Sequence, residues 1–143
     1  MKIVDRTGFD WDLGGLRRFA DPIVFIGRAL MSVIFLLDGY GKIFEYRDVA
    51  AYMQDYGVSR LLLPLAILTE LGGGLSILFG LKTRWAAIAL AGYAMLTAAL
   101  FHYSFADADQ AIHFQKNLAM AGGFVILAVF GPGGWSVDAW RGR

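Results

Sequence analysis

The sequence contains no cysteine among its 143 residues. This absence excludes disulfide bonds, thiol redox chemistry, thiolate metal sites and cysteine-ligated iron–sulfur clusters. Charged residues are also scarce at 17%, whereas an average soluble domain carries about a quarter. The net charge is +1 and no run of basic residues occurs, so nothing in the charge pattern indicates nucleic-acid binding.

Apolar residues, in contrast, make up 57% of the chain, and its mean hydropathy is +0.54. A bilayer core of roughly 30 Å is crossed by about 20 apolar residues in a helix, and the sequence contains several such stretches. It therefore predicts an all-α, integral-membrane four-helix bundle. The expected spans are residues 22–44, 60–81, 84–105 and 113–131, which together form one membrane domain over residues 22–143. The connection at 45–59 is expected to form a short helix or lid over the mouth of the bundle.

The N-terminal residues 1–21 carry charges throughout and contain no apolar run. They are expected to form a tail in the cytoplasm or at the membrane interface rather than a cleavable signal peptide. Most of the 13 Lys and Arg residues lie in the two termini and in the short connection after the second span. The positive-inside rule then predicts that both termini are cytoplasmic.

Several polar side chains fall inside the predicted spans, where an ionisable group is costly unless it faces a partner or a cavity. Glu70 lies near the middle of the second span, roughly 15 Å from its outer end at 1.5 Å per residue. On the first span, four polar side chains share an arc of about 120° around the helix. These residues are Arg28, Ser32, Asp38 and Lys42. This polar arc is expected to face the interior of the bundle.

Two ion pairs are expected from these positions. Asp38 and Lys42 are spaced i,i+4 in the favourable order for a helix-stabilising pair, and Glu70 and Arg28 are candidates for a buried structural pair. Two alternatives stay open. An unpaired Glu70, protonated at pH 7, would donate or accept a proton for a ligand, and Arg28 would snorkel to the headgroups.

The remaining polar candidates lie nearer the outer end of the bundle. His102 is expected to make a hydrogen bond at the interface, with a role as a ligand-binding residue as the alternative. Asn117 is expected to tie helices together. The three glycines at 72–74 favour close helix packing, and the alternative is that they leave room for a planar ligand beside Glu70.

Metal and haem chemistry find little support in the sequence. His102 and His113, with Asp107 and Asp109, match no recognised spacing of metal ligands, so no metal site is predicted. No haem, flavin, P-loop or dinucleotide motif is found. Any electrons used in a reaction would therefore have to come from a partner protein.

Three stretches carry a resemblance to a known family. They are GRALMSVIFLLDGYGKI at 27–43, LLLPLAILTELGGGLSILFGLKTRWAA at 61–87 and QKNLAMAGGFVILAVFGPGGWSVD at 115–138. The chain resembles the DoxX family of small four-span bacterial membrane proteins. This resemblance implies a multi-pass protein of the inner (cytoplasmic) membrane, and a link to quinone redox systems, because the family is named after a subunit associated with a thiosulfate:quinone oxidoreductase. The matching polar positions are Arg28, Lys42, Glu70 and Asn117.

Three functional hypotheses follow, and they leave open whether the protein is an enzyme. The first is a subunit of a membrane redox system that binds a quinone or another small ligand and works with a redox partner protein. In this hypothesis Glu70 is the catalytic proton carrier, and the ligand-binding residues are Arg28, Asp38, Lys42, Glu70, His102 and Asn117, with apolar contacts from Tyr40, Tyr93 and Met95. The second is a non-enzymatic anchor for a partner complex. The third is a small proton-coupled transporter, which would require a homo-oligomer because no inverted repeat or broken helix is found.

Overall fold

The computed structural model describes residues 16–142, and within this range the chain forms helices without any strand. The elements are the 3-10 helix η1 (Leu16–Phe19), α1 (Ala20–Phe44), α2 (Tyr46–Asp55), the 3-10 helix η2 (Arg60–Leu62), α3 (Leu63–Phe79), α4 (Thr83–Phe101), α5 (Ala108–Phe130) and α6 (Val137–Arg141). Four segments, namely α1, η2 with α3, α4 and α5, are long and apolar enough to cross a membrane. The predicted all-α fold with four membrane-length helices is confirmed. The cytoplasmic location of both termini stays a prediction, and most of the predicted tail at 1–21 lies outside the described residues.

The largest differences from the expected spans occur at the connection between α4 and α5. Helix α4 ends at Phe101 rather than near residue 105, and α5 begins at Ala108 rather than near residue 113. The early start of α5 has a local cause. The Asp107 side chain accepts a hydrogen bond of 2.9 Å from the backbone N–H of Asp109, which is the contact of a helix N-cap.

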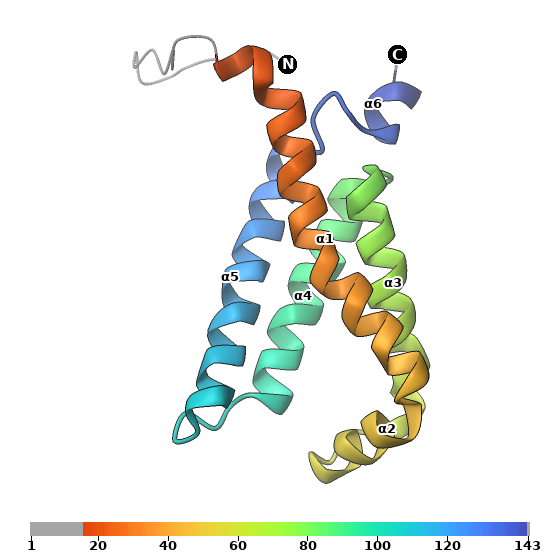
Figure 1. The fold of residues 1–143 in the computed structure, drawn as a ribbon, viewed down its shortest axis with the longest axis vertical. Coiled ribbons are helices and arrows are strands. Elements are labelled where there is room, and N and C mark those ends of the chain that lie inside the picture. The colour runs from red at the N-terminus through yellow and green to blue at the C-terminus, as the bar shows by residue number, and fades with distance from the viewer. Residues whose placement is uncertain (1–15, 143) are drawn as a thin grey trace.

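The long helices run alternately in opposite directions (Figure 1). As a result, η1 and α6 lie at one end of the bundle, here called the terminal end, and α2 lies at the opposite end, here called the α2 end. Helix α1 packs along α3 and α4 packs along α5, while α3 makes a smaller contact with α4. The two pairs, α1 with α3 and α4 with α5, diverge toward the α2 end (Figure 1).

The core that joins the two pairs is made of small and aromatic side chains. Phe35 on α1 and Phe124 on α5 are buried and meet edge to face, with ring centroids 5.4 Å apart. A Cβ added at Gly73 would lie 2.8 Å from Leu90 Cδ2, and one at Gly74 would lie 3.0 Å from Leu36 Cγ. The packing role expected for the glycines at 72–74 is thus confirmed for Gly73 and Gly74, whereas Gly72 has open space beside it.

The terminal end is closed by α6. Its Asp138 carboxylate accepts hydrogen bonds from the backbone N–H groups of Lys82 (2.7 Å) and Thr83 (2.8 Å) and from the Thr83 hydroxyl (2.9 Å). Asp138 therefore caps the N-terminus of α4 from a helix that lies more than fifty residues away in sequence. Burial raises the pKa of Asp138, but these hydrogen bonds and the charge of Arg141 outweigh burial, so its pKa lies below the ordinary value of 3.8.

The turn between α3 and α4 is short because Gly80 ends α3 in the left-handed conformation, with φ of 69°. Only a residue without a Cβ adopts this conformation readily. The backbone N–H of Leu81 returns to the carbonyl of Ser76 at 2.9 Å, which satisfies part of the end of α3. The two helices therefore leave this turn as antiparallel neighbours, with residues at equal distances from it lying level.

Candidate functional site

A cavity of about 510 Å³ lies between the two helix pairs toward the α2 end. Five of the six residues predicted to bind a ligand line it. These are Asp38 and Lys42 from α1, Glu70 from α3, His102 from the end of α4, and Asn117 from α5. The divergence of the pairs thus brings side chains from four spans around a single space.

Glu70 is the most deeply buried of these groups, with 3% of its surface exposed. Its Oε1 atom accepts two hydrogen bonds, one of 2.8 Å from Lys42 Nζ and one of 2.6 Å from the Tyr93 hydroxyl. Its Oε2 atom is buried and has no hydrogen-bond partner within residues 16–142. One oxygen of the carboxylate is therefore fixed by the protein, whereas the other has no hydrogen-bond partner among the described residues, which is unusual for a buried polar atom.

The predicted pairing of Lys42 with Asp38 is wrong. Lys42 forms its ion pair with Glu70, and this is the salt bridge found in the described part of the chain. Asp38 is exposed, whereas Glu70 is buried, so the buried carboxylate has the greater need for a compensating charge. Close approach of the two helices makes the contact feasible, since a Cβ at Gly39 would lie 2.8 Å from Leu71 Cγ and 3.1 Å from Glu70 Cβ.

The predicted ion pair between Glu70 and Arg28 is also wrong. The buried Arg28 side chain lies at the terminal end, where its NH1 atom donates to the carbonyls of Ile77 (2.9 Å) and Leu78 (3.1 Å) and its NH2 atom donates to the carbonyl of Trp135. Carbonyls at a helix C-terminus lack intrahelical partners and attract cations. Arg28 therefore caps α3 and joins it to the segment before α6, and it does not line the cavity.

Tyr93 has a role that the sequence interpretation missed. It was expected to give apolar contact, and it lines the cavity, but its hydroxyl is the second donor to Glu70. A simple signal was present. Glu70 and Tyr93 lie at nearly equal distances along the chain from the turn at Gly80, and antiparallel neighbours place such residues level. The two other expected apolar contacts, Tyr40 and Met95, do not line the cavity.

The histidines lie at the α2 end of the cavity. His102 Nδ1 is 2.7 Å from Gln110 Oε1, which is the kind of hydrogen bond expected of an interfacial residue. Its ring stacks on that of His113, with centroids 5.0 Å apart and an angle of 21° between the planes. Among residues 16–142, no three His, Cys, Asp or Glu side chains are grouped so as to hold a metal ion.

Helix α2 covers the α2 end of the cavity, and the expected short helix in this connection is confirmed. Tyr52 stacks on Phe101 of α4, with ring centroids 5.7 Å apart, and Tyr56 meets the same ring edge to face. Burial and the neighbouring Tyr56 hydroxyl raise the pKa of Tyr52 to about 12. These aromatic contacts connect α2 to the opposite helix pair, so α2 bridges the divergent end of the bundle.

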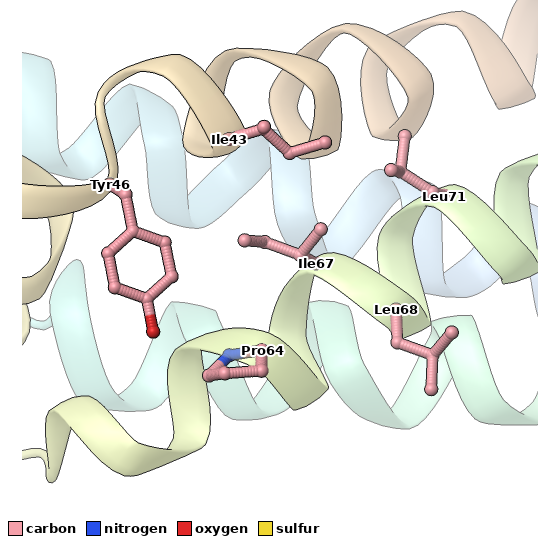
Figure 2. Close-up of a pocket in the computed structure, with 6 residues that line it drawn as sticks. All are labelled: Ile43, Tyr46, Pro64, Ile67, Leu68 and Leu71. Atoms are coloured by element: carbon pink, nitrogen blue, oxygen red, sulfur yellow. The ribbon is translucent and has the colours of Figure 1, made fainter.

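A second, shallower hollow of about 470 Å³ lies on the outside of the bundle, where α1 ends and α2 begins beside α3. Figure 2 shows the six residues that line it, which are Ile43, Tyr46, Pro64, Ile67, Leu68 and Leu71. None of these six side chains carries a charge. The hollow offers apolar surface to lipid and lacks the groups needed for chemistry, so the candidate site is the cavity at Glu70.

The sequence is similar to those of known bacterial inner membrane proteins. The DoxX family profile matches residues 23–103. The chain is 46% identical over 123 residues to the inner membrane protein YqjF of Escherichia coli strain K12, a match that covers 86% of this chain and 95% of that protein. It is 29% identical over 135 residues to the inner membrane protein YphA of the same strain, covering 90% and 94% of the two chains. No solved structure matches the chain.

Proposed function

The chain belongs to the DoxX family of integral inner-membrane proteins, and on this premise we propose that it binds a quinone or a similar ring carbonyl compound in the cavity at Glu70. The observation that carries the proposal is the state of the Glu70 carboxylate. Its Oε1 atom is held by Lys42 and Tyr93, while its buried Oε2 atom has no partner in the described range. A buried oxygen without a hydrogen-bond partner costs free energy unless a ligand or a water molecule donates a hydrogen bond to it, or a proton binds to it.

The size and lining of the cavity fit such a ligand. Its volume of about 510 Å³ falls within the usual range for small-molecule sites, about 300–1,000 Å³. Apolar side chains such as Phe35 and Met120 supply most of the wall, and the polar groups gather around Glu70. A planar ring with oxygen atoms at its edge matches this division, because the ring faces need apolar contact and the oxygens need hydrogen-bonding partners.

The residues would act on the ligand through one carboxylate oxygen. Because Lys42 and Tyr93 fix Oε1, Oε2 is the atom through which Glu70 would donate to a carbonyl when protonated or accept from a hydroxyl when charged. The positive charge of Lys42 compensates the carboxylate when Glu70 releases its proton. A bound quinone supplies a reversible redox couple whose oxygens take up and release protons, and a partner protein would exchange the electrons.

The experiment is a binding measurement on purified protein in lipid nanodiscs. Decylubiquinone is titrated into the wild type and into the Glu70→Gln variant, and binding is followed by quenching of tryptophan fluorescence. We expect the variant to bind about tenfold or more weakly, since the amide cannot exchange the proton. Asp109→Asn is the matched control, because it neutralises an exposed carboxylate that does not line the cavity. Absence of binding to the wild type would refute the proposal.

A non-enzymatic anchor is the second candidate, and one observation favours it. The Glu70 carboxylate joins α1, α3 and α4 through Lys42 and Tyr93, so the same residue also holds the bundle together. If this is its whole role, Glu70→Gln lowers the melting temperature and the wild type binds no quinone. If the quinone proposal is correct, the wild type binds the compound, and Glu70→Gln loses binding at temperatures where it is still folded.

A further inference from the structure

Two side chains that line the cavity at Glu70 are also exposed on the surface of α3 and α4. Leu65 of α3 and Leu96 of α4 both line the cavity, yet 60% and 56% of their surfaces are exposed. They lie at nearly equal distances from the turn at Gly80, so they lie level with each other on these antiparallel helices. Side chains that line a cavity and are also exposed on membrane-spanning helices mark an opening toward the acyl chains.

The gap follows from the architecture of the bundle. Near the turn, α3 and α4 are in close contact, as shown by the 2.8 Å that would separate a Cβ at Gly73 from Leu90 Cδ2. Farther from the turn the two helix pairs diverge (Figure 1). Leu62 and Leu100 continue the apolar lining at the next level, and both are partly exposed.

The path from this opening to Glu70 is apolar in character. Thr69 and Thr97 also line the cavity, but each hydroxyl donates to a carbonyl of its own helix, Thr69 to Leu65 at 2.8 Å and Thr97 to Ala94 at 3.0 Å. Their hydrogen atoms are therefore already used. At 1.5 Å per residue, Glu70 lies only about 7 Å along the helix axis from Leu65.

The opposite side of the cavity, between α1 and α5, has a different character. Asp38 and Lys116 line the cavity there, and both are exposed. Charged side chains at this position favour water and headgroups rather than acyl chains. The two sides of the cavity thus differ in chemistry, one apolar toward α3 and α4 and one charged toward α1 and α5.

From this asymmetry we propose that the ligand is a membrane-borne amphiphile, a quinone with a long apolar tail, whose ring lies at Glu70 and whose tail leaves the cavity between Leu65 and Leu96. This inference rests on the proposed function and specifies its substrate class. The ring receives hydrogen bonds at the buried end, and the tail stays in contact with acyl chains throughout. A water-soluble ring compound would gain nothing from the apolar opening.

The test compares two compounds that share the same ring. Decylubiquinone carries a ten-carbon tail, and the tail-less ubiquinone ring compound does not. Both are titrated into protein in nanodiscs, and both affinities are expressed as the mole fraction of the compound in the bilayer, so that partitioning into lipid does not enter the comparison. The portal variant is Leu65→Trp/Leu96→Trp, which narrows the gap. The matched control is Leu68→Trp/Met95→Trp, because these exposed residues lie on the same helices, 68% and 56% exposed, and do not line the cavity.

We expect the portal variant to bind decylubiquinone about tenfold or more weakly and the tail-less compound within about twofold of the wild type. Equilibrium affinity falls, and not only the binding rate, because the bound tail occupies the gap. The control variant should bind both compounds as the wild type does. Melting temperatures establish that each variant is folded. If the double portal variant does not fold, the single Leu65→Trp and Leu96→Trp variants replace it.

The outcomes separate the two proposals. If the folded portal variant binds both compounds as tightly as the wild type, or loses affinity for both equally, the proposed path of the tail between α3 and α4 is wrong. If the wild type binds the tail-less compound as tightly as the tailed one, the preference for an amphiphile is wrong while quinone binding stands. If the wild type binds neither compound, the proposed function itself fails.

Discussion

Lys42 on α1 and Glu70 on α3 form an ion pair in the membrane-spanning part of the bundle, with 2.8 Å between Nζ and Oε1. The two residues are 28 positions apart, with α2 between them in the chain. Because Tyr93 donates to the same oxygen, three spans meet at one atom. The arrangement stabilises the buried charge through one carboxylate oxygen, while the other, Oε2, has no hydrogen-bond partner in the described part of the chain.

Replacing Lys42 should be far more disruptive than replacing Asp38. Lys42→Met leaves Glu70 buried without a compensating charge, and such a loss costs roughly 3 kcal/mol of stability. Asp38→Asn changes an exposed carboxylate that is not paired with Lys42, so we expect a change within about 0.5 kcal/mol. Thermal unfolding in detergent measures both. The double variant Lys42→Met/Glu70→Gln should recover much of the loss, and a double variant as unstable as Lys42→Met would contradict this account.

Removing the Tyr93 hydroxyl should lower the stability of the bundle, while Lys42 and Glu70 still provide polar groups in the cavity. Tyr93→Phe deletes one of the two donors to Glu70 Oε1, and a hydrogen bond to a charged group contributes about 1.5–3 kcal/mol. A double-mutant cycle with Glu70→Leu isolates this contribution, because leucine has no oxygen that could accept from the Tyr93 hydroxyl, and the two residues should show a coupling energy well above zero. Additive effects of the two substitutions would mean that the hydrogen bond does not contribute to stability.

Arg28 should behave as a structural cap rather than as part of the site. Arg28→Met removes the donors to the carbonyls of Ile77, Leu78 and Trp135. The Ile77 carbonyl still accepts from the backbone N–H of Gly80, but those of Leu78 and Trp135 lose the donor that Arg28 gives them, so we expect a loss of about 2–3 kcal/mol. Arg28→Lys should recover only part of it, since one ammonium group cannot replace the guanidinium fork. Quinone affinity of the folded variants should stay near that of the wild type.

Arg84 is an exposed counterpart of the buried Arg28. Arg84 also donates to helix C-terminal carbonyls, those of Ala128 and Val129, but from an exposed position. Water and headgroups can replace its donors, so Arg84→Met should have a clearly smaller effect on the melting temperature than Arg28→Met. Equal effects would show that burial of Arg28 is not the source of its contribution.

The Asp138 cap should make part of the stability depend on pH. Hydrogen bonds lower the pKa of Asp138 below the ordinary value of 3.8, so its contribution is fully present above that value and is lost as the pH falls through the lower pKa of the folded state. Asp138→Asn should cost about 1 kcal/mol at pH 7. The difference in melting temperature between the wild type and this variant should shrink below about pH 4, and a constant difference between pH 7 and pH 3 would contradict the assignment.

The fold could be predicted because its signals are local and strong. Apolar runs of membrane length predict the four spans, and the Gly-rich segment at 131–134 predicts the end of the last one. Five of the six polar residues singled out from the sequence lie around one cavity, because polar groups within apolar helices are few and face inward. Their partners were not identified, since hydropathy gives the depth of a side chain but not which neighbouring helix it meets.

Two residues illustrate this limit. Lys42 has an acidic residue one turn away in Asp38, and sequence spacing favours that pair, but a buried carboxylate on another helix competes more strongly. Asp138 lies in a short helix near the end of the chain, and nothing in its neighbourhood points to the start of α4, 55 residues earlier. Only Tyr93 could have been assigned from the sequence, by counting outward from the short turn at Gly80.

The order of the helices has a consequence for biogenesis. Lys42 leaves the ribosome well before Glu70, because α2 and the start of α3 are made between them. During that interval the acidic neighbour available to the Lys42 ammonium group on its own span is Asp38, one helical turn earlier. The ion pair with Glu70 can therefore form only after α3 has been made and has packed along α1.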